Sequence, residues 1–259
     1  MSPEQLLVLF FVSLAANLLS ALAGGGAGLL QLPALLMMGL PFATALATHK
    51  IASVALGVGA GFRHLRTGSV SARRSLAILG AGLPGVWVGA HLILGIPERQ
   101  AELMLGLLTL GLGVYSFISK GLGLAAEHRT LSPAASFTGY AVLFGIGVLN
   151  GSLTSGTGLF VTIWLVRWFG LGFGEAVAYT LILVGVFWNG LGALALGLQA
   201  PVAWLWLPAL LAGSLLGGYA GAHMALLKGN GYVKRAFEIL TVVVGLKLIS
   251  DAMASLLAP

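Results

Sequence analysis

The sequence predicts an all-α polytopic membrane protein made of two homologous halves with inverted topology. Each half is expected to begin with a glycine-interrupted helical hairpin, which is followed by three spanning helices. Three observations support this fold class. The 259 residues are 58% hydrophobic and 8% charged, with a mean hydropathy of +1.02, whereas soluble domains contain about 25% charged residues. Long apolar segments recur along the chain, and residues of its first half reappear in its second half.

About 20 apolar residues span a bilayer, and on that scale the sequence contains eight hydrophobic segments. They cover roughly residues 5–39, 43–62, 74–95, 100–119, 134–169, 174–197, 202–227 and 233–257. The first and fifth segments are far too long for a single span, and each contains an interruption. A hairpin in which the chain turns back near the interruption accounts for the excess length.

The two interruptions are expected to form a binding site. The first is the cluster Gly24-Gly25-Gly26-Ala27-Gly28, and four glycines within five positions should break a helix because each costs about 1 kcal/mol relative to alanine. The second, at 149–159, is rich in Asn, Ser and Thr. Broken helices in hydrocarbon are tolerated where they line a polar cavity, and paired breaks in two halves indicate a transporter's substrate site. The N–H groups that start each following half-helix favour an anion.

An internal repeat defines the two halves. Its clearest trace is a set of four residues that reappears 132 positions later, Gly85, Gly89, Ala90 and His91 as Gly217, Gly221, Ala222 and His223. Gly28-Leu29 likewise corresponds to Gly158-Leu159, 130 positions later. We predict a first transmembrane repeat over 1–120, a cytoplasmic linker over 121–133 and a second transmembrane repeat over 134–259.

Charge predicts the orientation. The loop after the second segment contains Arg63, His64, Arg66, Arg73 and Arg74, and the positive-inside rule places it in the cytoplasm. A later loop contains Lys228, Lys234 and Arg235. This loop falls on the same side if the fifth segment is a hairpin that enters and leaves from the cytoplasm. By symmetry the first segment is also a hairpin, so both termini are predicted outside.

Small residues spaced four apart predict close helix packing. They are Gly57-x-x-x-Gly61, Gly85-x-x-x-Gly89 and Gly213-x-x-x-Gly217-x-x-x-Gly221. We expect packing within one chain, although a dimer face would use the same pattern, so a homo-oligomer stays open.

Other functional classes are disfavoured. Cysteine is absent, which excludes disulfides and thiolate metal sites. The histidines show no metal-ligand spacing and Asp251 is the sole aspartate, so we predict no enzyme activity, no metal and no cofactor. The net charge of +6 lies mostly in two loops, and it is interpreted as a topology signal rather than a nucleic-acid surface.

Lys50 is the sharpest candidate for a functional residue. A lysine at membrane depth is costly and is by default a functional hypothesis, and its ammonium would neutralise an oxyanion held at the first break. The alternative is a lysine that snorkels to the interface. Its neighbour His49 titrates near neutral pH and would couple anion movement to protons, or it packs between helices.

Further candidates lie at and around the second break. Hydroxyl and amide donors there suit an oxyanion, or they satisfy the broken backbone; the candidates at this break are Asn150, Ser152, Thr154, Ser155, Gly156, Thr157 and Gly158. Weaker substrate-binding candidates are Gln31, Thr48, Thr180 and Asn189. Arg167 and Glu175 flank one short loop and would form an interfacial ion pair.

The order and spacing of these motifs resemble the TauE/SafE family over essentially the whole chain. The matching elements are the glycine break, Leu30 to Leu35, Gly39-Leu40-Pro41, Thr48-His49-Lys50 and Arg63 to Gly68. The resemblance implies a secondary carrier of small sulfur-containing anions such as sulfite, sulfoacetate and other organosulfonates. Two departures lie at the expected site: His49 stands where the family commonly has Asn, and the second break is not glycine-rich.

Together these observations predict a secondary transporter, acting as an exporter of a small sulfur-containing anion by alternating access, in a bacterial cytoplasmic (inner) membrane. Its expected partners are the small anionic substrate, the lipid bilayer and a coupling proton or ion. A passive anion channel and a carrier of a small carboxylate are the alternatives.

Overall fold

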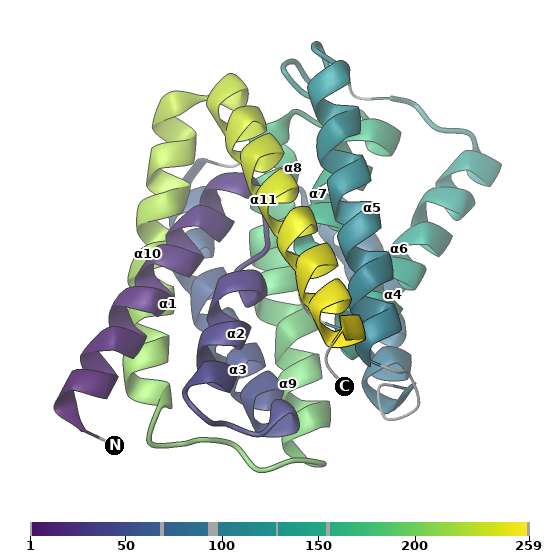
Figure 1. Ribbon diagram of the computed structural model, residues 1–259. Helices are drawn as coiled ribbons and strands as arrows, with labels where there is room; N and C mark the ends of the chain where they lie inside the picture. The colour runs from purple at the N-terminus through teal and green to yellow at the C-terminus, as the bar shows by residue number, and fades with distance from the viewer. Residues whose placement is uncertain (1, 68–69, 93–97, 128, 154–155, 258–259) are drawn as a thin grey trace.

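The computed structural model describes residues 2–67, 70–92, 98–127, 129–153 and 156–257, and within these ranges all regular structure is helical (Figure 1). The elements are α1 (Pro3–Ala23), α2 (Gly28–Met37), α3 (Phe42–His64), η1 (Leu65–Thr67), α4 (Ala72–Leu92), α5 (Glu98–Ile118), α6 (Pro133–Leu153), α7 (Thr157–Phe169), α8 (Phe173–Tyr179), η3 (Thr180–Trp188), α9 (Asn189–Gly197), α10 (Leu207–Lys228) and α11 (Asn230–Leu257). The predicted all-α fold is confirmed in this part of the chain. The inverted relation between the halves and the limits of the repeats and linker stay predictions.

Six of the described helical stretches are long and apolar enough to cross a membrane. They are α1, α3, α4, most of α6, the continuous stretch α8–η3–α9, and α10. The two segments predicted to be too long each form a long helix and a shorter one, α1 with α2 and α6 with α7. Each short helix packs against its long partner, so the predicted breaks lie where the chain turns back.

Glycine stripes join the two halves of the chain. Helix α10 lies along α1, and a Cβ atom at Gly213, Gly217 or Gly221 would collide with the carbonyl groups of successive turns of α1. Helix α4 lies along α6 in the same way, because Gly85 and Gly89 face carbonyl groups of α6. The small-residue motifs therefore serve packing within the chain.

We expect Gly217→Ala to destabilise the protein by about 1–3 kcal/mol, because its Cβ would overlap the Leu14 carbonyl oxygen and two helix backbones would have to separate. Gly80→Ala is the matched control, since Gly80 is a helical glycine with no atom near the added Cβ, and alanine there should stabilise the helix by about 1 kcal/mol. Thermal unfolding in detergent measures both. Equal melting temperatures for the two variants would contradict the packing role.

The basic loops of both halves gather at one end of the bundle. Arg74 forms an ion pair with Glu175 at 3.0 Å, and Arg63 Nε donates to His223 Nδ1 at 3.0 Å. Asn230 connects the α10–α11 turn to the linker by donating to the Leu124 carbonyl oxygen at 2.9 Å. The partner of Glu175 is thus Arg74 and not the predicted Arg167, whose main-chain oxygen accepts from Arg129.

At the opposite end of the bundle, two described connecting loops are uncharged. The α2–α3 turn and the loop 198–206 contain no charged residue, and the start of α1 lies at the same end as that loop (Figure 1). The structure thus separates a basic end from a neutral end. The side of the membrane that each end faces stays a prediction.

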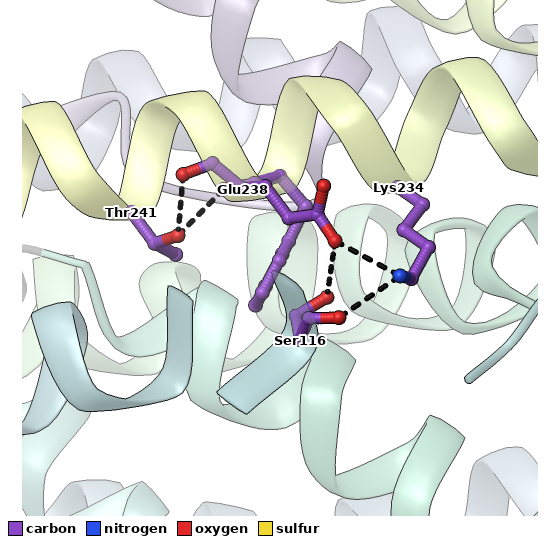
Figure 2. Close-up of polar contacts among 5 residues, drawn as sticks. Ser116, Lys234, Glu238 and Thr241 are labelled. Atoms are coloured by element: carbon purple, nitrogen blue, oxygen red, sulfur yellow. Dashed lines mark hydrogen bonds and ion pairs between the residues drawn. The ribbon is translucent and has the colours of Figure 1, made fainter. Parts of the chain in front are cut away.

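Helices α5 and α11 pack against each other through a buried polar cluster (Figure 2). Lys234 Nζ lies 2.9 Å from Glu238 Oε1 and donates to the Ser116 carbonyl oxygen, also at 2.9 Å. Ser116 Oγ donates to the same Glu238 oxygen at 3.1 Å. The Lys234 and Glu238 side chains are 8% and 14% exposed, so this ion pair is largely removed from solvent.

Removing one partner of a buried ion pair leaves the other charge uncompensated, here that of Lys234, so Glu238→Gln should destabilise the protein by about 3 kcal/mol. The double variant Lys234→Met/Glu238→Met removes both charges and should recover most of that loss. Thermal unfolding of both variants in the same detergent tests the expectation. A double variant that is less stable than Glu238→Gln would rule it out.

Candidate functional site

The two helix breaks meet inside the bundle. Gly24, Gly25 and Gly26 have positive φ angles of 83°, 145° and 98°, a region that favours glycine. A Cβ atom on Gly25 would lie 2.7 Å from the Gly158 carbonyl carbon, so the tips of the two hairpins are in backbone contact. Thr162 Oγ1 stabilises this contact by donating a hydrogen bond to the Gly24 carbonyl oxygen at 2.8 Å. The glycines of the first break are therefore needed for both turn geometry and close approach.

A small polar cavity lies beside this contact. Its volume is about 40 Å³, which is room for roughly three water molecules or one small ion. The main chain of both breaks lines it, together with a set of polar side chains: Ser20, His49, Ser53, Asn150, Thr157, Thr180 and Asn189. No carboxylate is among the described residues that line it. The cavity therefore offers donors and no anionic competitor.

Two helix N-termini border the cavity. Helix α2 begins at Gly28 and helix α7 at Thr157, and both residues line it. The residues preceding them, Ala27 and Gly156, form no side-chain cap hydrogen bond. The first N–H groups of a helix lack intrahelical partners, and the helix dipole makes such a terminus favourable for an anion.

Ser20 provides an independent indication of a ligand. Its side chain is 1% exposed and lines the cavity, yet its Oγ has no hydrogen-bond partner among the described residues. A buried polar group without a partner costs about 1–3 kcal/mol. A ligand with hydrogen-bonding oxygens in the cavity would remove this cost.

Lys50 reaches the second break rather than the first. Its ammonium donates to Asn150 O at 2.7 Å, to Asn150 Oδ1 at 3.0 Å and to Asn189 Oδ1 at 3.2 Å. The residue is fully buried, so it does not snorkel. Lys50 is not part of the cavity lining, but its ammonium orients the side-chain amides of Asn150 and Asn189, which are. The three oxygens that it contacts use all three of its N–H donors. Asn150 Nδ2 in turn donates to Thr157 Oγ1 at 2.8 Å.

The structure brings most predicted site residues to the cavity, but not all. Those that line it are Gly25, Gly26, Ala27, Gly28, His49, Asn150, Thr157, Gly158, Thr180 and Asn189. Gly24 and Gly156 belong to the breaks but do not line the cavity, and Gln31 contacts His49 on the side of the ring away from the cavity. Thr154 and Ser155 lie outside the described residues.

Two predicted residues are engaged elsewhere. Thr48 Oγ1 donates to the Thr44 carbonyl oxygen and accepts from the Ala203 N–H, toward the neutral end. Ser152 Oγ donates back to the Val148 carbonyl oxygen within α6. Neither side chain lines the cavity, because each satisfies backbone groups of its own surroundings.

Sequence reasoning missed the serines Ser20 and Ser53, which both line the cavity. The repeat offset contained a signal for Ser20, since it lies 130 positions before Asn150. Ser53 is one helical turn after His49, on the same face of α3.

Broken helices that meet at a polar cavity within a membrane bundle are typical of membrane transporters. The chain belongs to the TauE/SafE sulfite exporter family, whose model matches residues 9–248. It is a membrane transporter of this family and an integral membrane protein. The resemblance stated from the sequence is confirmed.

Three relatives span almost the same length. The chain is 31% identical to a probable membrane transporter protein of Haemophilus influenzae over 96% of each chain. It is 29% identical to the probable membrane transporter protein YfcA of Escherichia coli, over 97% of this chain and 92% of the relative. It is 26% identical to the probable membrane transporter protein YdhB of Bacillus subtilis, over 94% and 100%. No solved structure matches the chain. These names are consistent with the prediction that the chain is not an enzyme.

Proposed function

We propose that the protein is a secondary carrier that exports a small sulfur-containing anion, such as sulfite or an organosulfonate, by alternating access. The observation that carries this proposal is the meeting of two helix N-termini, those of α2 and α7, at one small cavity to which the described residues contribute no carboxylate. The hydroxyl of Ser20, which has no partner in the described part of the chain, adds a donor, and the ammonium of Lys50 outside the cavity lining adds a positive charge. All these features favour a compact oxyanion.

We further propose that the basic end faces the cytoplasm and that both termini lie outside, in the cytoplasmic membrane of a bacterium. The positive-inside rule supports this orientation, since the charged loops gather at one end and the opposite connecting loops 38–41 and 198–206 are uncharged. Cysteine accessibility at Gln199 and Arg73, probed with an impermeant thiol reagent, tests it. Labelling of Arg73→Cys in intact cells would overturn the orientation.

Counterflow in proteoliposomes tests the transport proposal. Labelled sulfite, sulfoacetate and a carboxylate control are offered to vesicles preloaded with the unlabelled anion. A carrier gives saturable uptake of the labelled anion that requires unlabelled anion inside the vesicles. A channel lets the labelled anion equilibrate whether or not unlabelled anion is inside. Ser20→Ala should weaken binding of the transported anion about tenfold, since it removes one hydrogen bond of about 1.4 kcal/mol. Exchange of none of these anions by the wild type would reject the proposed function.

A further inference from the structure

A chain of buried hydrogen bonds links His49 to helix α10. Ser13 Oγ donates to the Leu210 carbonyl oxygen at 2.8 Å, because a carbonyl can only accept. With its proton used there, Ser13 Oγ accepts from Gln31 Nε2 at 2.8 Å. The other end of the Gln31 amide, Oε1, lies 2.7 Å from His49 Nδ1. Ser13, Gln31 and His49 are all buried, so the order of donors is fixed from the Leu210 carbonyl to the imidazole.

This chain sets the tautomer of His49. Because Gln31 Oε1 can only accept, Nδ1 must hold the ring proton, and Nε2 of the neutral ring then holds a lone pair. Nε2 lies 3.2 Å from Ser53 Oγ, and both residues line the cavity. A serine hydroxyl can donate to a bare Nε2 or accept from a protonated one. A proton can therefore be added at Nε2 without any change in the hydrogen bonds behind the ring.

His49 is the single titratable side chain among the described residues that line the cavity. Helices α1 and α2 present Ser20 and Gln31, and the elements η3 and α9 present Thr180 and Asn189, all of them neutral. Lys50 follows His49 on α3, and its ammonium is held by the oxygens of Asn150 and Asn189. No carboxylate lines the cavity in the described part of the chain. A buried imidazolium needs a counter-charge, and an anion in the cavity is the one that this arrangement can supply.

We infer that His49 Nε2 is a proton-binding site and that the proton binds and moves together with the anion. The inference rests on the proposed anion carrier and identifies its coupling ion. A proton from water on the loading side forms the Nε2–H bond, the imidazolium donates to the bound anion, and both leave to water on the other side. One proton with each monoanion makes the step electroneutral.

The number of protons taken up per anion bound is the decisive quantity. Calorimetric titration of the purified full chain in two buffers with different ionisation heats yields it after subtraction of a blank without protein. The probe is methanesulfonate, because a sulfonate stays a monoanion at every pH used, whereas sulfite itself takes up a proton near neutral pH. We expect about one proton per methanesulfonate for the wild type, and an affinity that falls about tenfold per pH unit in alkaline buffer. In His49→Asn the amide can still donate to Gln31, but it cannot bind a proton. This variant should bind methanesulfonate with no proton uptake and no pH dependence.

His91→Asn is the matched control, because His91 bonds to its own helix at the Trp87 carbonyl oxygen, away from the cavity. It should keep one proton per methanesulfonate. Methanesulfonate binding by the wild type without proton uptake would overturn the inference and leave the carrier standing. A His49→Asn variant that still takes up one proton, or that binds no methanesulfonate at any pH, would also overturn it. Absence of sulfonate, sulfite and carboxylate binding in the wild type would instead reject the proposed function.

Discussion

Replacing Lys50 with glutamine should weaken anion binding about 50-fold while the protein still folds. If the ammonium is taken to lie about 7 Å from a monoanion in the cavity, their attraction at an effective dielectric constant of about 20 is about 2.4 kcal/mol. The charge is lost in Lys50→Gln, but the glutamine amide keeps donors for the Asn150 oxygens, which Lys50 contacts at 2.7 and 3.0 Å. The expected loss is therefore electrostatic rather than structural.

The KM of anion counterflow in proteoliposomes, together with the melting temperature in detergent, separates the two effects. Lys50→Met is the informative companion, since it removes the ammonium donor from two buried oxygens of Asn150 and a partly buried oxygen of Asn189, and each buried group left unpaired costs about 1–3 kcal/mol. It should lower the melting temperature as well as transport. Lys228→Gln removes an exposed lysine at the end of α10 and should change neither. Wild-type affinity in Lys50→Gln would show that the ammonium does not act on the anion.

Lys50 also illustrates how far the sequence can be interpreted. Its cost at membrane depth marked it as functional from the sequence alone, because any lysine there needs partners. Those partners, Asn150 and Asn189, are 100 and 139 positions away, and no local pattern connects them. The sequence therefore predicted the residue, whereas the break that it contacts became known only from the structure.

The cavity serines were missed for a different reason. A single serine in an apolar helix is uninformative, since it can bond to the carbonyl four residues earlier and need no ligand. Ser20 becomes significant because α1 ends at Ala23, which places the hydroxyl beside two helix N-termini. Its role depends on where two chain reversals meet, and hydropathy contains no such information.

The π-helical segment η3 was likewise beyond sequence reasoning. Its run Thr180–Trp188 is uniformly apolar after the first residue, and such a run predicts a helix without specifying its winding. Thr180, Leu181, Val184 and Gly185 of this segment line the cavity, and π-helical turns occur frequently at functional sites. Gly185 packs against Gly57 of α3 with their backbones in contact. The π-helical winding therefore coincides with a tertiary contact that the local sequence does not specify.

Gly25→Ala should lower transport about a hundredfold, and Gly39→Ala should leave it near the wild-type rate. Both glycines have positive φ, 145° and 93°, so an alanine at either position costs about 1–2 kcal/mol of backbone strain. The two positions differ in their surroundings. A Cβ on Gly25 would lie 2.7 Å from the Gly158 carbonyl carbon and from the Leu159 nitrogen, whereas a Cβ on Gly39 meets nothing within 4 Å.

The difference between these two variants isolates the contact between the breaks. Backbone atoms of Gly158 and Leu159 cannot rotate away from an added methyl group, so the two hairpin tips must separate. A displacement of about 1 Å in preorganised donors costs roughly a hundredfold in activity, and the N-termini of α2 and α7 would move apart by a comparable amount. Counterflow of the anion that the wild type exchanges should therefore fall about a hundredfold in Gly25→Ala and stay near wild type in Gly39→Ala. Both melting temperatures should fall through backbone strain, and that of Gly25→Ala further, because the overlap with Gly158 and Leu159 adds to the strain. Equal activity of the two variants would mean that the helix N-termini need not meet for transport, and the anion site would then have to lie elsewhere in the bundle.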